Sequence, residues 1–324
     1  MFTTLAIAAL LAAGGPVAGG RSGAKVIRHG AEINPRTGMA LPPFELLVRA
    51  VKQRDRGATE RIVARMGPGR LTQGLVQTDR RVVLAVLTAA PVSREALLLT
   101  EPVADLTSSS DPAVAAAAAH TMGQLLNGET AADFELWEVP PDVVAHACAA
   151  LRGLALRGLA AAPARLAALV ALADATGVCN DTDELLPILK DADGGLRRAA
   201  AQAVRPLSTA AVAALSEAIR DPAPGVQTAA VATLCRRERA LFLNGRRIDA
   251  GAAAAAFATA RVLILQPSTP ADDAVDMLGC LNTAGTAADK KIEDQLRRGS
   301  PSPVRDLLAP PPPADSAAAP AKGP

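Results

Sequence analysis

Aromatic residues are scarce in this chain of 324 residues, which has five Phe, one Trp and no Tyr. A β-sandwich or β-barrel needs more aromatic and β-branched side chains, so the composition argues against both folds. Binding of single-stranded nucleic acid needs aromatic stacking platforms, and the formal net charge of +2 gives little attraction for a polyanion. We therefore expect no nucleic-acid partner.

Small and aliphatic residues are abundant instead. Half of the chain is hydrophobic by count, and Ala, Leu and Val supply most of that half. Ala has the highest helix propensity, and its small side chain lets neighbouring helices approach closely. The composition therefore predicts an all-α fold.

A short pattern recurs along the chain and is clearest after Asp111-Pro112. Small or apolar residues lie three, four and eight positions after Val114, and these offsets recur, wholly or in part, from six other residues. The seven start residues are Val82, Val114, Ala164, Leu196, Val226, Pro270 and Val304. Because these offsets fall on one face of a helix, each start residue predicts a helix with an apolar face.

The segments between these helices also have helical patterns, so each unit is predicted to be a helical hairpin of about 30 residues. They are Pro141 to Gly158, Asp183 to Lys190, Thr209 to Arg220 and Ala250 to Leu265. Asp followed by Pro suits a helix start, because Asp accepts hydrogen bonds from free backbone N–H groups and Pro has no N–H to lose. Gly67-Pro68-Gly69 predicts a turn that ends a helix.

The segment from Asp111 to Gly123 resembles the HEAT repeat, especially the short HEAT-like units of phycobilisome lyases. That motif runs roughly Asp-Pro-x-Val-Arg-x-x-Ala-Ala-x-x-Leu-Gly, and this segment departs from it only at Ala115 and Met122. The resemblance covers roughly residues 44–309 and implies an α-solenoid of stacked hairpins, an armadillo-type superhelix. It implies no particular activity.

Two spacings between start residues are longer than the rest and indicate insertions. The first, residues 127–142, is acidic without any basic residue, and the second, residues 236–249, is rich in Arg. Insertions in repeat proteins often form the binding face, where aromatic and Arg side chains anchor partners. The candidate partner-binding residues are Phe134, Glu135, Trp137, Glu138, Arg236, Arg237, Phe242, Arg246 and Arg247. The alternative is that Trp137 and Phe242 fold inward and cover helix ends.

The four cysteines are Cys148, Cys179, Cys235 and Cys280. Their spacings match no zinc-binding motif, and four cysteines permit three disulfide connectivities. Cys235 and Cys280 occupy near-equivalent positions in consecutive units, and Cys148 and Cys179 belong to one hairpin. These positions favour the pairs Cys148–Cys179 and Cys235–Cys280, with four buried thiols as the alternative.

The two ends of the chain differ from the repeats in composition. Residues 1–20 have a short apolar core followed by small residues, which is typical of a signal peptide, although no Lys or Arg precedes the core. Residues 21–43 are expected to form a loosely structured lead-in, and the Pro- and Ala-rich residues 310–324 a disordered tail. We expect an exported protein, periplasmic or extracellular, with no transmembrane segment in the mature chain; a cytoplasmic protein with an Ala-rich first helix is the alternative.

No catalytic motif stands out. The three His residues form no His-Glu-x-x-His motif, and there is no Gly-x-Ser-x-Gly sequence. We therefore expect a non-enzymatic scaffold or adaptor without metal or cofactor, which binds a protein or peptide through its groove and its two insertions. The family resemblance leaves one alternative, a cytoplasmic lyase-like or accessory protein of the phycobilin-lyase type.

Overall fold

The computed structural model describes residues 27–28, 31–32, 42–175, 177–298 and 304, in two units that divide between Leu46 and Leu47. In the first unit, β1 (Ile27–Arg28) pairs antiparallel with β2 (Ala31–Glu32), and α1 (Pro43–Lys52) crosses the division. The predicted signal peptide and tail lie outside the described residues.

The described residues of the second unit form helices that alternate between two rows. The first row comprises α2 (Arg56–Leu75), α4 (Thr100–Leu106), α6 (Pro141–Leu156), the 3₁₀ helix η5 (Asp183–Lys190), α9 (Thr209–Ala218) and α11 (Ala250–Leu263). The second row comprises α3 (Arg80–Ala89), α5 (Pro112–Leu126), α7 (Ala162–Asp174), α8 (Gly194–Ala203), α10 (Pro224–Phe242) and α12 (Ala271–Ala284).

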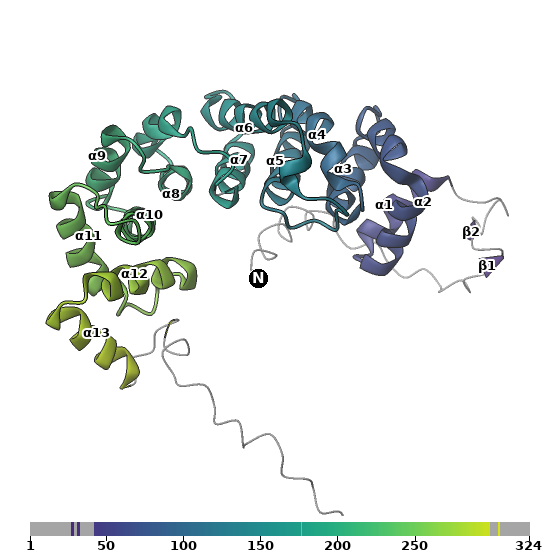
Figure 1. Cartoon of the computed structure of the whole chain (residues 1–324). Helices are drawn as coiled ribbons and strands as arrows, with labels where there is room; N and C mark the ends of the chain where they lie inside the picture. Colours follow the sequence, from purple (N-terminus) through teal and green to yellow (C-terminus); the bar gives the residue numbers. More distant parts are fainter. Residues whose placement is uncertain (1–26, 29–30, 33–41, 176, 299–303, 305–324) are drawn as a thin grey trace, which may run out of the picture. The chain divides into compact units, whose positions relative to one another are not determined.

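Each first-row helix packs against the second-row helix that follows it, and within each row every helix packs against its neighbours (Figure 1). The last helix, α13 (Ala287–Arg297), packs against α12. Short 3₁₀ helices η2 (Ala90–Val92), η3 (Ala96–Leu99) and η4 (Leu136–Glu138) lie in the connections. Residues 42–175 and 177–298 thus contain helices and no strand, as the composition predicts.

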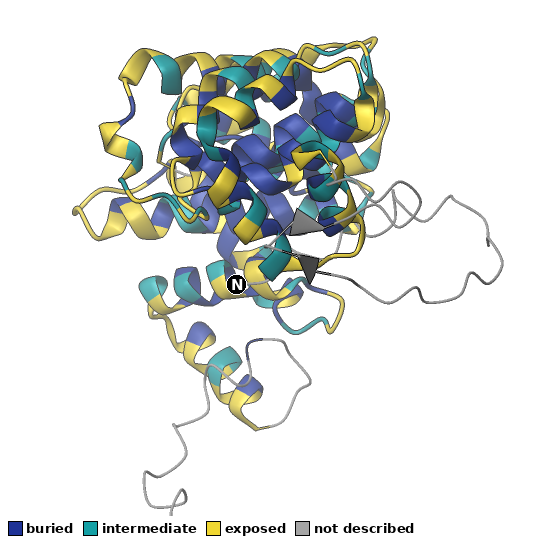
Figure 2. Ribbon diagram, turned by 90° about the vertical axis from the view of Figure 1, so that its right-hand side faces the viewer, coloured by how far each residue is buried: buried dark blue, intermediate teal, exposed yellow. Residues whose placement is uncertain are grey.

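The predicted apolar face of the second-row helices is buried, and buried residues gather in the interior of the packed helices (Figure 2). Four positions after each start residue, six side chains have no exposed surface: Val86, Ala118, Ala168, Ala200, Ala230 and Ala274. Eight positions after, the residues are Ala90, Met122, Leu172, Val204, Leu234 and Leu278, all buried. The predicted register is therefore confirmed from α3 to α12.

Small residues in this register permit close packing. In α5, a Cβ atom built on Gly123 would lie 3.0 Å from the Cα atom of Ala171 in α7, which is tighter than ordinary contact. A side chain at position 123 would therefore push these two helices apart. The capping prediction is also confirmed here, because the Asp111 carboxylate accepts hydrogen bonds from the backbone N–H groups of Ala113 and Val114 at 2.8 and 3.4 Å.

Successive hairpins are also joined by ion pairs that keep to the repeat register. Arg165 and Arg197 each lie one position after a start residue. Arg165 donates to Asp191 at 2.9 Å, and Arg197 donates two hydrogen bonds to Asp221 at 2.8 and 3.0 Å. These side chains are mostly buried. The same contact therefore recurs from one hairpin to the next.

The turn predicted at Gly67-Pro68-Gly69 is present, because Gly67 leaves helical geometry with φ +69°, and a second helical segment of α2 begins at Pro68 and continues to Leu75. One sequence prediction needs correction. The segment Asp183–Lys190 forms 3₁₀ helix rather than α-helix. It contains Pro187, which has no N–H for an α-helical hydrogen bond.

Candidate functional site

The first insertion, residues 127–142, is the acidic insertion, and it lies against the body of the protein. Its backbone N–H groups at Ala131 and Asp133 donate to the carbonyl oxygens of Pro91 and Arg94 at 2.9 and 2.7 Å. These bonds place the insertion over the connection that follows α3. The acidic insertion is therefore held in one conformation at its base.

Trp137 lies on η4 within this insertion and is 80% exposed. Phe134 is half-buried, while Glu135 and Glu138 are exposed. The backbone N–H of Glu135 donates to the Glu138 carboxylate at 2.7 Å, which holds the short helix together. For Trp137, the alternative that it folds inward is wrong.

The five carboxylates of the acidic insertion form no ion pair with any residue in the part of the chain that the structure describes. They belong to Glu129, Asp133, Glu135, Glu138 and Asp142. Glu129 also acts on its neighbours, because its charge adds to burial in raising the pKa of Asp174. The charged side chains of the acidic insertion are therefore all negative.

The second insertion, residues 236–249, is the basic insertion, and its first half is helical. Arg236 and Arg237 lie on the last turns of α10, which extends to Phe242, so only residues 243–249 form a loop. Arg236 and Arg237 are therefore helix residues, and the insertion begins as a continuation of α10. Arg236 pairs with Asp276 of α12 at 2.6 Å and so links two second-row helices.

The loop of the basic insertion folds back onto α10. Buried Glu238 accepts a hydrogen bond from the Ile248 backbone N–H at 2.9 Å and pairs with Arg247. The Arg247 guanidinium lies 5.5 Å from the ring centroid of Phe242. Phe242 is 43% exposed and Leu243 is 76% exposed, so an apolar group at the surface lies beside the Arg side chains.

Three of the arginines here remain without an ion-pair partner. Among the described residues, Arg237, Arg239 and Arg246 form no salt bridge. Both insertions follow second-row helices, which run in the same direction, so both lie at the same edge of the stack. Two further second-row helices, α7 and α8, separate them, and the structure therefore does not bring the two insertions together into one site.

The predicted cysteine pairs are confirmed at disulfide distance. Cys148 of α6 pairs with Cys179, and Cys235 of α10 pairs with Cys280 of α12, with Cα–Cα distances of 5.5 and 5.0 Å. The first pair closes one hairpin, and the second ties consecutive second-row helices together. Disulfides form and persist in oxidising compartments.

A polar cluster between α8, α10 and α12 was not predicted from the sequence. Gln202 of α8 donates to Asp273 of α12 at 3.5 Å, and Asp273 is 2% exposed. Burial raises the pKa of Asp273, and the second oxygen of its carboxylate has no hydrogen-bond partner. The sequence does contain an indication of this cluster, because Asp273 occupies the third position after Pro270, where earlier units have Ala.

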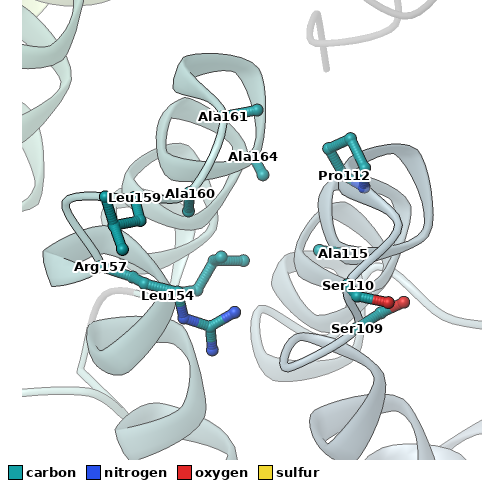
Figure 3. Close-up of a pocket in the computed structure, with 10 residues that line it drawn as sticks. All are labelled: Ser109, Ser110, Pro112, Ala115, Leu154, Arg157, Leu159, Ala160, Ala161 and Ala164. Carbon is teal, nitrogen blue, oxygen red and sulfur yellow. The ribbon is translucent and has the colours of Figure 1, made fainter.

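A pocket of about 310 Å³ lies between the start of α5 and the turn that joins α6 to α7 (Figure 3). Arg157 extends toward the side where Ser109 and Ser110 lie, and alanines and leucines form much of the rest. Arg157 is exposed. The pocket therefore lacks a buried charged group that would fix a ligand.

The described residues hold no group of three or more His, Cys, Asp or Glu side chains suited to a metal ion. None of their helices is both long and apolar enough to cross a bilayer.

No family model and no curated protein matches the chain. Among solved structures, the X-ray structure of YibA from Escherichia coli is similar at 12% sequence identity and a TM-score of 0.38. The match covers 78% of this chain and 95% of YibA. A similarity this weak says nothing about function.

Proposed function

We propose that this chain is a non-enzymatic, exported scaffold, built as a HEAT-like α-solenoid, that binds a protein or peptide partner through the acidic insertion. The repeated register of buried residues and the two rows of helices support the solenoid. The two cysteine pairs support export, because a reducing cytoplasm disfavours disulfides.

The exposure of Trp137 carries the binding proposal. Leaving a large aromatic side chain 80% exposed forgoes the burial free energy that the inward conformation would provide. Tryptophan is the residue type most enriched among the anchors of protein interfaces. The insertion is held at its base by backbone hydrogen bonds, so little conformational entropy is lost when a partner covers it.

The charge of the acidic insertion defines the chemistry of the partner. The insertion that carries the exposed indole of Trp137 and the half-buried phenyl ring of Phe134 also carries five carboxylates that form no salt bridge with the described residues. The complementary surface is basic and contains an apolar group for Trp137 to contact. The partner is therefore a basic segment of a protein or peptide.

Photo-crosslinking in the native cells tests this function. A photo-reactive phenylalanine analogue is introduced at position 137 and, as the control, at position 159. Leu159 is also fully exposed, but it lies in the neutral to basic turn after α6. We expect a discrete adduct from position 137 that position 159 does not give. No adduct from position 137, or the same adducts from both positions, contradicts the proposal.

A further inference from the structure

The two insertions have opposite charge. The acidic insertion has five carboxylates and no basic residue, whereas the basic insertion has five Arg against Glu238 and Asp249. Within the basic insertion, Arg236 and Arg247 are already paired and Arg237 is half-buried, which leaves the exposed Arg239 and Arg246 to meet an external acid. Each insertion therefore carries charges that are complementary to those of the other.

The apolar groups of the two insertions also suit each other. Trp137 projects among the acidic residues, and Phe242 with Leu243 is exposed among the arginines. Aromatic and Arg side chains are the groups that interface centres favour over Lys, Glu and Asp. In such a contact the indole of Trp137 lies against the phenyl ring of Phe242 and the side chain of Leu243. The oppositely charged residues of the two insertions lie around this apolar centre, as the polar rim does in protein interfaces.

Both surfaces exist before any partner arrives. Backbone hydrogen bonds to Pro91 and Arg94 hold the acidic insertion, and buried Glu238 holds the loop of the basic insertion. Because both are pre-formed, their association costs little ordering entropy. The two insertions of one chain do not meet, since α7 and α8 lie between them.

We infer that the acidic insertion of one copy binds the basic insertion of a second copy. This rests on the proposed function and names its partner. Each chain has both insertions at one edge of the stack, so an antiparallel pair of chains joins each acidic insertion to the basic insertion of the other. Such a contact closes with two-fold symmetry, and two linked contacts bind more tightly than one.

The mass of the full chain in solution, measured by sedimentation equilibrium, tests the pairing. At about 0.1 M salt we expect the mass of two chains, and at about 1 M salt the mass of one, because the screening length falls from about 10 Å to about 3 Å. Trp137→Ala is expected to give one chain in both conditions. A single-chain mass of the unaltered protein at about 0.1 M salt overturns the inference.

Charge reversal provides a second test. The variant Glu129→Lys/Asp133→Lys/Glu135→Lys changes the net charge of the acidic insertion from −5 to +1, and the variant Arg239→Glu/Arg246→Glu changes that of the basic insertion from +3 to −1. We expect each variant alone to have the mass of one chain and the equimolar mixture to form 1:1 pairs. Variants that dimerise alone, or a mixture that stays monomeric while both variants keep their helical circular dichroism and melting temperature, overturn the inference.

The proposed binding function and the inferred pairing of two copies can be tested independently of each other. If the chain is monomeric but position 137 crosslinks to a different protein, the acidic insertion is a binding surface and only the second copy is excluded. If the chain crosslinks to itself from position 137 in cells, both proposals are supported.

Discussion

The hydroxyl group of Thr121 in α5 donates a hydrogen bond to the backbone carbonyl of Leu87 in α3, at 2.9 Å. Within α3 this carbonyl would accept from the N–H of residue 91, but Pro91 has none. The threonine of the next hairpin therefore supplies the missing donor. Thr233 makes the same contact with Ala201 at 2.8 Å, again from the seventh position after a start residue to the fifth position of the preceding unit.

The substitution Thr121→Val should destabilise the protein by about 1–3 kcal/mol, because it leaves the buried carbonyl of Leu87 without a donor. Thr121→Ser keeps the hydroxyl and is the matched control, with an expected loss below about 1 kcal/mol. Equilibrium unfolding in denaturant measures both. Equal stability of the Val and Ser variants would show that the contact contributes nothing.

Asp221→Asn tests the ion pair between hairpins. The hydrogen bonds from Arg197 hold the pKa of Asp221 below its usual value of 3.8. The ionised pair therefore stabilises the folded state above that pH, and this contribution is lost as the pH falls through the lowered pKa.

We expect the Asn variant to melt at a lower temperature than the unaltered protein near neutral pH, and the difference to shrink below about pH 4. Melting curves across this range measure it. A difference that does not change with pH would assign the effect to packing rather than to charge.

Asp273→Asn should change the stability at neutral pH in the opposite direction to Asp221→Asn. Burial raises the pKa of Asp273 above its usual 3.8, although Arg198, Gln202 and Arg236 partly oppose this and Asp276 adds to it. The unaltered protein therefore loses stability as the pH rises from about 4 toward the raised pKa, and each pKa unit corresponds to about 1.4 kcal/mol.

Because asparagine does not ionise, Asp273→Asn should be the more stable protein at neutral pH and equal to the unaltered one at low pH. Differential scanning calorimetry at several pH values measures the gap. A variant that is less stable at neutral pH would show that the charged carboxylate has a stabilising partner.

Removing a cysteine pair should cost about 3–4 kcal/mol, because each disulfide closes a long loop and restricts the unfolded chain. The sequence separations are 31 residues for Cys148–Cys179 and 45 for Cys235–Cys280. The double variants Cys148→Ala/Cys179→Ala and Cys235→Ala/Cys280→Ala, unfolded in denaturant, test each pair. If reductant lowers the stability of the unaltered protein but not of a variant that lacks both pairs, the effect belongs to the disulfides.

The core of the second row could be predicted from the sequence, because burial follows helical periodicity and small residues recur at fixed offsets. Ala118 and Ala230 are fully buried at equivalent positions, as the pattern requires. The pair Cys235–Cys280 followed from the same register, and the pair Cys148–Cys179 followed from the hairpin that contains both residues. A periodic pattern thus predicts contacts between units once the units are known to stack.

The sequence could not decide what lies between the periodic segments. Trp137 fits either a buried or an exposed position by its chemistry, and the backbone hydrogen bonds that fix its loop involve carbonyl groups that carry no sequence signal. Helix α10 continues through Arg236 to Phe242, and Glu238 on its buried face holds the following loop. The contact between Gln202 and Asp273 spans 71 residues and depends on how three hairpins stack.

Trp137 is the only tryptophan, and the chain has no tyrosine, so tryptophan fluorescence reports on this one side chain. The most direct test is its emission and its quenching by iodide in protein gently purified from its own cells, before and after transfer to about 1 M salt, where charge contacts are screened. We predict emission at shorter wavelength and protection from iodide before the transfer, and an exposed indole after it. An indole fully exposed in both states would contradict the account, because no partner would then cover the acidic insertion.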